Sequence, residues 1–232
     1  MLHLNRPIWS IALQGGITIT KRFRNLEAHK QKRIINAALK EFTEKGYEQA
    51  STNQIVKDAG IGKGMLFYYF NSKRGLYNYL INYCIEMTES QFLNLLDTSE
   101  RDFFKRLKKM SMIKLAFLKK HPDAMNFLGT ILINHAEHLT EALTSRIEAL
   151  QKAGYAKMYD NLDYSLFRED VDVKKAFDLI RWSFDGYEQE LKYRLRDQPL
   201  RSNDLEPYFD EFFDYLDIMR RCFYKTEGEG KT

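Results

Sequence analysis

The chain of 232 residues contains little cysteine and little proline, and both shortages restrict its fold. Its two cysteines, Cys84 and Cys222, are far apart in the sequence, which excludes a disulfide framework and favours reduced thiols in a cytoplasm. No proline lies between Pro7 and Pro122, so long helices can form there. No run of about 18 apolar residues is present, so the sequence predicts no transmembrane helix and no membrane partner.

Signals of a catalytic or cofactor site are also scarce. No Gly-rich phosphate loop and no Ser/His/Asp arrangement stands out, so neither a catalytic residue nor a cofactor is predicted. One feature of the sequence supports a metal-dependent enzyme: His135 and His138 are one helical turn apart and Glu141 follows three residues later, a spacing that could ligate a metal. The segment is not an HExxH motif and has no evident distant ligand. A polar helix face is therefore the favoured interpretation, and no metal site is predicted.

The net charge of +4 is unevenly distributed along the chain. Residues 1–74 contain 13 Lys and Arg against 5 Asp and Glu, which gives +8, whereas the remainder carries −4. A basic head on a slightly acidic body indicates that the head contacts a polyanion, with nucleic acid as the first candidate. A solvated basic face without a partner is the alternative.

Both ends of the chain lack the signals of ordered structure. Residues 1–24 are predicted to be a tail outside the fold, since Gly15-Gly16 interrupts any helix and the following β-branched run favours extended backbone. Arg6 is the only basic residue among the first 20, which argues against a secretory signal peptide. A start codon assigned too far upstream is a second explanation of this segment. Residues 227–232, rich in Gly and charge, are predicted to be disordered.

Helical periodicity becomes clear from about His29. Apolar residues recur at the spacing of one helix face, which predicts a first helix that Gly46 terminates as a C-cap. Ser51 and Gln54 then have the spacing of a capping box and open a short second helix. The apolar face of the first helix consists of Ile34, Ile35, Ala38, Leu39 and Phe42.

A tight turn at Gly60-Ile61-Gly62 separates the second helix from a third one, predicted over residues 63–70. Asn71-Ser72 interrupts the third helix, and Ser72 can cap a long fourth helix that reaches about Leu96. No β-strand alternation and no internal repeat is evident, so the fold is predicted to be all-α with about nine helices. Further helices are predicted near residues 101–119, 123–150, 172–196 and 204–225.

Two short helices joined by a Gly-containing turn, behind a longer first helix, form the outline of a helix-turn-helix. Lys63 lies at the N-terminus of the third helix, and Lys73 and Arg74 lie at that of the fourth. Positive side chains there oppose the helix macrodipole at a cost of roughly 0.3–1 kcal/mol each. Anions bound at both helix ends, such as DNA phosphates, would explain this placement. At least one Tyr of the aromatic run Phe67–Phe70 must face outward, where it suits sugar-phosphate or thymine-methyl contact.

The run from Thr52 to Leu76, TNQIVKDAGIGKGMLFYYFNSKRGL, resembles the signature of the TetR family of regulators. Together with the first helix, the resemblance covers about residues 29–80. It implies a three-helix DNA-binding head over residues 25–75 and an all-α body over residues 76–226 that dimerises and binds a small ligand. The matching residues are Thr52, Ile55, Ala59, Gly60, Gly64, Leu66, Tyr68, Phe70, Ser72 and Lys73.

Three positions depart from the family pattern. Gly62 replaces the usual capping Ser, and Met65 replaces the usual Thr, a frequent base or phosphate contact. Phe67 replaces the usual Tyr, so the phosphate hydrogen bond of that Tyr does not carry over. For Tyr69, packing within the head is the alternative to a DNA contact.

By the resemblance, each remaining position of the head has an expected role. Lys63 and Gly64 would read bases, Gly64 by letting the backbone approach closely. Thr52 and Lys73 would hold phosphates, and Tyr68 could do either. The predicted DNA-binding residues are Thr52, Lys63, Gly64, Met65, Tyr68, Tyr69 and Lys73.

The last two predicted helices carry regular apolar seams. Each also has a second apolar side, and a helix that is apolar on two sides needs two partners. A four-helix bundle from two subunits supplies the second partner, although packing of the two helices within one chain is the alternative. The run IRWSFDGYE, residues 180–188, is similar to the dimer-forming penultimate helix of many TetR-like regulators. The predicted dimer residues are Phe177, Ile180, Trp182, Phe184, Tyr187, Leu191, Phe209, Phe212, Leu216 and Met219.

Aromatic and Met side chains crowd the predicted helices between the head and the dimer helices. The resemblance implies that some of them line a cavity for a bulky, mostly apolar effector, while most belong to the core. The predicted ligand residues are Tyr79, Tyr83, Met87, Phe103, Phe117, Met125 and Phe127.

These features predict a cytoplasmic, nucleoid-associated regulator rather than an enzyme. It would be a homodimeric repressor that binds a palindromic operator in double-stranded DNA and is released by a small apolar ligand. A DNA-bound protein that regulates a process other than transcription is the first alternative, and a metal-dependent enzyme using His135 and His138 is a distant second. The operator, the effector, the regulated genes and the choice between repressor and activator stay open.

Overall fold

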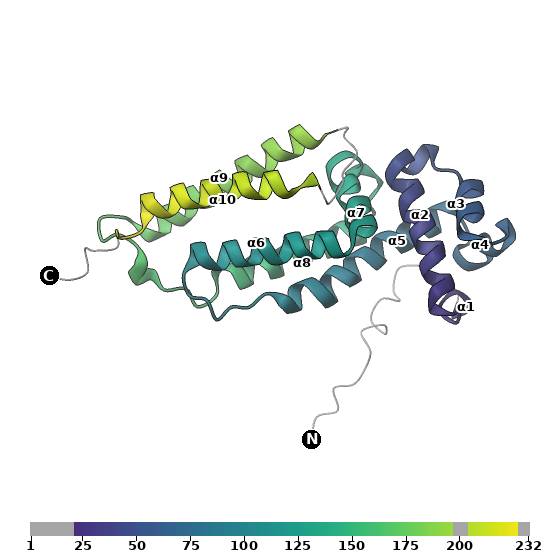
Figure 1. The fold of residues 1–232 in the computed structure, drawn as a ribbon, viewed down its shortest axis with the longest axis horizontal. Coiled ribbons are helices and arrows are strands. Elements are labelled where there is room, and N and C mark those ends of the chain that lie inside the picture. The colour runs from purple at the N-terminus through teal and green to yellow at the C-terminus, as the bar shows by residue number, and fades with distance from the viewer. Residues whose placement is uncertain (1–20, 197–203, 227–232) are drawn as a thin grey trace, which may run out of the picture. The chain divides into compact units, whose positions relative to one another are not determined.

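The computed structural model of the chain describes residues 21–196 and 204–226. Within these ranges the regular structure is helical, apart from one isolated antiparallel bridge between Phe167 and Tyr224, so the all-α prediction is confirmed. The tails predicted for residues 1–20 and 227–232 lie outside the described residues. The described residues form two compact units, divided between Tyr83 and Cys84 (Figure 1).

The first unit is a helical head whose boundaries follow local sequence signals. The backbone kinks at Gly46, whose φ is 66°, where a C-cap was predicted, but the helix continues beyond the kink to Gln49. The Ser51 hydroxyl accepts the Gln54 N–H at 3.4 Å, and Gly60 ends the next helix in the left-handed region. Ser72 caps the last helix by accepting the Gly75 N–H at 2.9 Å. The helices are α1 (Lys21–Arg24), α2 (Ala28–Gln49), α3 (Thr52–Ala59), α4 (Lys63–Phe70) and α5 (Lys73–Met87), the last of which continues into the second unit.

The second unit is a helical body, and some of its helix boundaries differ from the predicted ones. The fourth predicted helix does not stay regular to Leu96: after α5 the backbone forms a π-helical turn over Thr88–Phe92 and a 3-10 turn over Leu93–Leu95. None of the described helices is long and apolar enough to cross a membrane. The further helices are α6 (Phe103–Lys120), α7 (Pro122–Asn134), α8 (Glu141–Tyr159), α9 (Val173–Leu195) and α10 (Glu206–Phe223).

The single helix predicted over residues 123–150 is wrong. The helix ends before His135, whose φ of −141° and ψ of 32° are not helical, and α8 starts only after Thr140. The Thr140 hydroxyl caps α8 by accepting the Leu143 N–H at 3.4 Å. No Gly or Pro marks the break, so the sequence carries only the weak signal of a mid-helix Thr.

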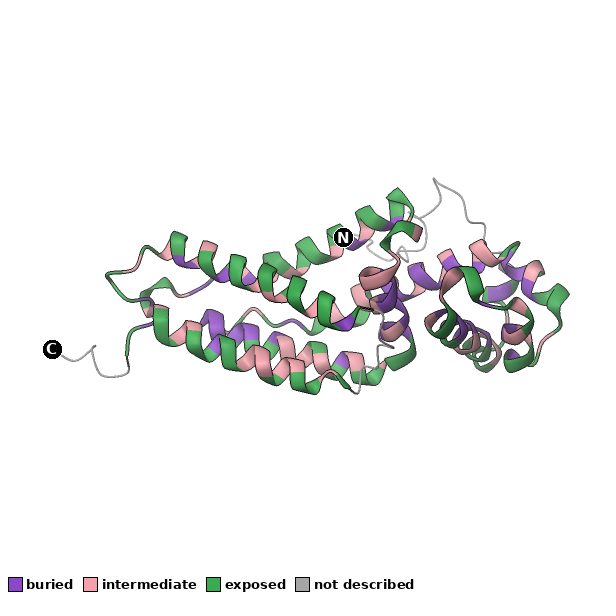
Figure 2. Cartoon of the chain, turned by 90° about the horizontal axis from the view of Figure 1, so that it is seen from above, coloured by how far each residue is buried: buried purple, intermediate pink, exposed green. Residues whose placement is uncertain are grey.

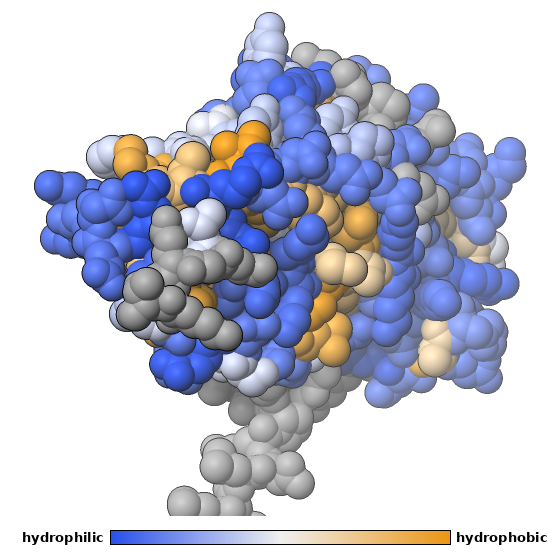
Figure 3. All heavy atoms as spheres, turned by 60° about the vertical axis from the view of Figure 1, so that its left-hand side comes forward, coloured by the Kyte–Doolittle hydropathy of each residue, from blue (hydrophilic) through white to orange (hydrophobic). Residues whose placement is uncertain are grey.

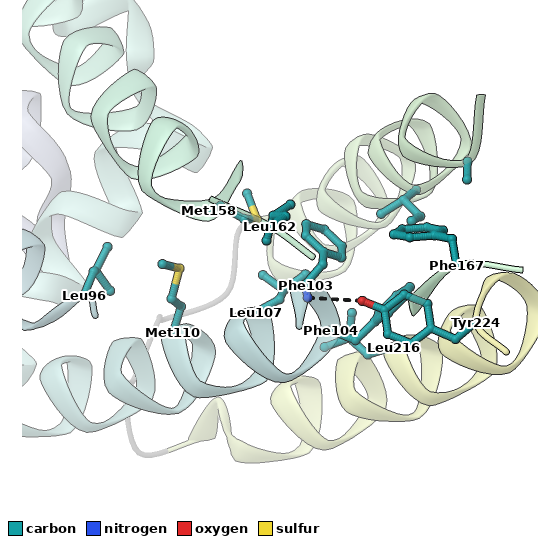
Figure 4. Packing of buried hydrophobic residues seen from close by; sticks show 12 residues of the cluster. Leu96, Phe103, Phe104, Leu107, Met110, Met158, Leu162, Phe167, Leu216 and Tyr224 are labelled. Atoms are coloured by element: carbon teal, nitrogen blue, oxygen red, sulfur yellow. Dashed lines mark hydrogen bonds between the residues drawn. The ribbon is translucent and has the colours of Figure 1, made fainter. Parts of the chain in front are cut away.

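Helices α6, α8, α9 and α10 each contribute buried residues to one apolar cluster, and each also carries exposed residues (Figure 2). Helix α6 lies at the centre of this arrangement and packs against α7, α8 and α10. The Phe103 ring contacts Phe104, Tyr159 and Phe177 at centroid distances of 5.1–5.6 Å. The Tyr224 hydroxyl, just beyond α10, accepts the Phe103 N–H at 3.1 Å and so ties the end of α10 to the start of α6 (Figure 4).

A buried arginine fixes the segment that precedes α6. The Arg106 side chain is fully buried, and its guanidinium donates hydrogen bonds to backbone carbonyls on both sides of it. It reaches Glu100 at 2.6 Å and Thr98 at 2.8 Å before α6, and Lys157 at 3.2 Å near the end of α8. Further acceptors are the carbonyls of Met158 and Asp160. One buried cation therefore supplies hydrogen-bond donors to part-buried and buried carbonyls before α6 and at the end of α8.

Candidate nucleic-acid interface and dimer face

Helix α4 separates its side chains into an inner and an outer set. Leu66 and Phe70 are buried at 1% and 2% exposure, and they anchor the helix in the core of the head. Lys63 and Gly64 are exposed, as are Met65 at 41% and Tyr68 at 46%. Exposed apolar and aromatic side chains on a fixed helix are typical of a contact surface, because exposing apolar surface to water is unfavourable and a partner would cover it.

Tyr69 does not belong to this surface. It is buried at 2% exposure, and its ring lies 5.7 Å from that of Phe23 and 6.3 Å from that of Phe70. Adjacent residues on a helix point about 100° apart, so exposing Tyr68 turns Tyr69 toward the core. The prediction of a DNA contact at Tyr69 is therefore corrected: Tyr69 is a packing residue.

The prediction that residues 21–24 belong to the N-terminal tail is wrong. They form α1, and Phe23 is fully buried against Tyr69, Phe70 and Tyr79. This packing holds the Arg22 guanidinium 4.3 Å from the centre of the exposed Tyr68 ring. Arg22 thus adds a cation to the outer side of α4. Its only sequence signal is the basic run KRFR around one aromatic residue.

The N-terminus of α4 is bare. Its N-cap residue is Gly62, which offers no side-chain acceptor, so no side chain of the N-cap residue caps the first N–H groups of the helix. A Cβ atom added at Gly62 or Gly64 would meet nothing within 4 Å. Open N–H groups at a helix start suit an anion, and the absent Cβ atoms allow a duplex to come close.

The orientation of α3 depends on a buried carboxylate. Glu41, on α2, is 7% exposed and accepts the Ser51 N–H at 2.8 Å. This bond fixes where α3 leaves α2, and it leaves Thr52 partly exposed at the first position of α3. The pattern of α2 gave no hint of this role, because an acidic residue next to an apolar face is ordinarily solvated.

The two cations at the start of α5 contact the end of α2. The Lys73 ammonium donates to the Glu48 carbonyl at 3.0 Å and lies 5.0 Å from the Tyr47 ring centre. The Arg74 guanidinium lies 3.8 Å from the same ring. Lys73 therefore stabilises the head itself, and its phosphate contact stays a prediction.

Gly75 is required by the turn between α4 and α5. A Cβ atom there would clash with the Phe70 carbonyl oxygen, whereas one at Gly64 would meet open space. We expect Gly75→Ala to lower the free energy of unfolding of the head by about 1–3 kcal/mol, because backbone must shift to admit the methyl group. Thermal unfolding monitored by circular dichroism measures the effect, with Gly64→Ala as the matched control. Equal stability of both variants would contradict this account of the turn.

The predicted ligand residues do not gather at one place in the body. Phe103 and Phe117 are both buried on α6, but 14 residues of helix separate them by about 21 Å. Phe103 belongs to the core cluster around Tyr224, whereas the Phe117 ring lies 5.6 Å from Phe92 and 4.9 Å from His121. Met87, Met125 and Phe127 are buried, and Tyr79 and Tyr83, in the head unit, are half-buried. One small ligand cannot contact both ends of this set.

Helices α9 and α10 pair within one chain. The Phe184 and Phe212 rings lie 5.4 Å apart, and the Arg194 guanidinium is 2.9 Å from the Glu211 carboxylate. The Tyr187 hydroxyl lies 2.9 Å from the Tyr208 carbonyl oxygen, and burial together with Glu211 raises the pKa of Tyr187 to about 12. Phe177, Leu191, Phe209 and Met219 are half-buried, while Ile180 and Leu216 are fully packed inside the chain.

The outer sides of α9 and α10 stay apolar and uncovered. Trp182 is 58% exposed, and Tyr215 and Ile218 are 45% and 48% exposed. Between the helices lies a groove of about 390 Å³ whose apolar lining includes Phe184, Phe212 and Met219. On the face drawn in Figure 3, apolar surface likewise lies open between hydrophilic side chains. The seams predicted from sequence thus pack partly inside the chain and partly face solvent.

Comparisons with known proteins identify the family. The sequence model of "Bacterial regulatory proteins, tetR family" matches residues 34–80. The HTH-type transcriptional regulator SAB2452 of Staphylococcus aureus (strain bovine RF122 / ET3-1) is 31% identical over 147 residues, which are 63% of this chain and 72% of that protein.

Solved structures share the fold. A TetR family transcriptional regulator from Chloroflexus aurantiacus J-10-FL has a TM-score of 0.57 and 22% identity over 89% of this chain and 99% of its own. AibR, solved in complex with isovaleryl coenzyme A and operator DNA, has a TM-score of 0.56 and 17% identity over 80% of this chain and 97% of its own. With the helix-turn-helix of α3 and α4 in place, the chain belongs to the TetR family and is a transcriptional regulator of that family.

Proposed function

We propose that the protein is a homodimeric repressor that binds a palindromic operator through α4 and leaves it when a small, mostly apolar ligand binds the body. The observation that carries the proposal is the outer side of α4, where Lys63, Gly64, Met65 and Tyr68 are exposed on a helix anchored from behind by the core. Because its target would be chromosomal DNA, the protein would work in the cytoplasm at the nucleoid. Membership of a family of regulators favours a binding protein over an enzyme.

The proposed DNA contacts fall into two groups, those to bases and those to phosphates. Lys63 and the bare backbone at Gly64 would face base edges, and Met65 would supply an apolar contact to a thymine methyl group. Arg22, Thr52 and Lys73 would hold phosphates, and Tyr68 could contact either a base or a phosphate. Phosphate contacts position the head without reading sequence, so substitutions in the two groups should have different consequences.

The proposal is tested by selecting bound genomic fragments and then measuring operator affinity. We expect Lys63→Ala to weaken operator binding by about 1–3 kcal/mol and to relax the base preference. Lys73→Ala should weaken all sequences alike and lower the salt dependence by about one phosphate contact. Since Lys73 also bonds to Glu48, thermal unfolding of this variant must show that the head stays folded at the assay temperature. Equal loss of specificity in both variants would contradict the assignment of roles.

The dimer proposal follows from how little of α10 is buried. Its buried residue is Leu216, although ten of its 18 residues are hydrophobic. A second copy would cover the exposed residues of α9 and α10 by forming a four-helix bundle. Two heads read two halves of a palindrome, so a symmetric dimer suits the proposed operator.

The ligand proposal narrows to the end of α6 near α7. Phe92 and Phe117 supply aromatic surface, and His121 adds a polar group: its Nε2 is buried without a hydrogen-bond partner among the described residues. Burial, and to a smaller extent Lys120, lowers the pKa of His121, which favours the neutral imidazole. A neutral imidazole beside aromatic rings suits an apolar ligand with one hydrogen-bonding group. The proposal is supported by AibR, a structure of similar fold that was solved with isovaleryl coenzyme A and operator DNA in one complex.

A further inference from the structure

The break between α7 and α8 places two imidazoles around one carboxylate. His135 ends α7 with non-helical backbone angles, and Ala136–His138 form a 3-10 turn. Glu137 Oε1 lies 3.6 Å from His135 Nδ1 and 3.7 Å from His138 Nε2. The ligand atoms of the three side chains all lie within 4.8 Å of one another.

This convergence depends on the helix break. In a continuous α-helix, residues two apart point to nearly opposite sides, so His135 and Glu137 could not share a ligand. The non-helical backbone of His135 removes that obstacle. The turn is closed by the His138 N–H, which donates to the His135 carbonyl at 3.0 Å, and the two imidazole centroids lie 5.8 Å apart.

We propose that His135, Glu137 and His138 form a binding site for a divalent transition-metal ion, with Zn²⁺ as the best match. Imidazole nitrogen and carboxylate oxygen are ordinary zinc ligands, and bonds of about 2.0–2.2 Å place tetrahedral ligands about 3.4 Å apart. The two His–Glu separations are already close to that spacing, so small side-chain rotations complete the site. Three protein ligands leave a fourth position to water. Mg²⁺ fits poorly, because it prefers six oxygen ligands.

The surroundings favour a cation. No Lys or Arg occurs between Lys120 and Arg146 in the sequence, so no basic residue of this segment competes for Glu137. The side chains of His135 and His138 are 34% and 20% exposed, and the turn limits their conformational freedom. All three residues belong to the second unit of the chain.

Equilibrium dialysis of the metal-free full-length protein against Zn²⁺ tests the site. The exposed thiol of Cys222 is first removed by Cys222→Ser, so that it does not bind the metal. We expect one high-affinity Zn²⁺ per chain, and His135→Ala, His138→Ala and Glu137→Gln should each weaken binding by roughly ten-fold or more. His29→Ala is the matched control, because His29 pairs with Glu27 at 3.3 Å and offers two ligands instead of three. This control should bind as tightly as the parent.

Two further measurements distinguish metal binding at the proposed site from nonspecific binding to the protein surface. Co²⁺ should give the visible absorption of a low-coordinate nitrogen and oxygen site in the parent and not in His135→Ala. Zn²⁺ should raise the midpoint of thermal unfolding of the parent but not of the variant, since a ligand that binds only the folded state stabilises it. Mg²⁺ should do neither. Failure of the parent to take up Zn²⁺ at 100 µM, or equal uptake by all three site variants, would overturn the proposal.

Discussion

Replacing Trp182 and Ile218 by glutamate is expected to convert the protein into a monomer and to lower its operator affinity by roughly 100-fold or more. Both side chains are about half exposed in the single chain, so charges there should not disturb its folding. In the proposed dimer they would be buried against the partner, where unpaired carboxylates are strongly unfavourable. A monomer also loses the second head, and with it the high local concentration that two linked heads provide.

Sedimentation velocity and operator titration measure this prediction. Phe184 and Phe212 are less suitable targets, because their rings pack on each other within one chain and charges there would unfold the body. Met112→Glu serves as the control: Met112 is also 58% exposed but belongs to α6 and is not among the α9 and α10 residues proposed for the dimer face. If the double variant sediments as a dimer with unchanged operator affinity, the subunit contact lies elsewhere.

Arg106→Met should lower the free energy of unfolding of the body by at least about 3 kcal/mol. Met has nearly the same length as Arg, so the substitution removes the charge and the hydrogen bonds with little loss of volume. The carbonyls of Thr98, Glu100 and Lys157 would lose this donor at part-buried positions, and the Met158 carbonyl would lose it at a buried one. Each buried carbonyl left without a partner costs about 1–3 kcal/mol.

Urea unfolding of the full chain measures this effect. Arg101→Met is the matched control, since Arg101 is exposed and makes one long hydrogen bond, of 3.4 Å, to the Asn161 carbonyl. Its effect should stay within about 0.5 kcal/mol, as for most surface substitutions. Similar stabilities of the two variants would show that the Arg106 bonds contribute little to the body.

The head illustrates how far local signals determine structure. Ser51, Gly60 and Ser72 act through neighbours within three or four residues, and the structure confirms each of them. Tyr69 could not be assigned in this way, because four consecutive aromatics give helix α4 no apolar periodicity. Only Phe23, 46 residues away in the sequence, shows which side of the helix is buried.

The region around His135 shows the opposite case. The apolar pattern of residues 123–150 is compatible with one long helix, and the break has no Gly or Pro to announce it. Capping of α8 by Thr140 contributes about 1 kcal/mol, and packing of α7 and α8 against α6 supplies the rest of the preference. The three possible metal ligands are brought together by this break, so spacing alone pointed to Glu141 instead of Glu137.

By itself the sequence determined the all-α class, the boundaries of most helices, the helix-turn-helix and the family, because these depend on periodicity, capping and a dense local motif. The tertiary structure decided which aromatic residues face outward, how α1 brings Arg22 to Tyr68, and how Arg106 and Glu41 join separate segments. It also split the predicted ligand residues between two ends of α6 and left the outer sides of α9 and α10 uncovered. Such features rest on contacts between residues far apart in the chain, and the free energy of those contacts is not encoded in any single local pattern.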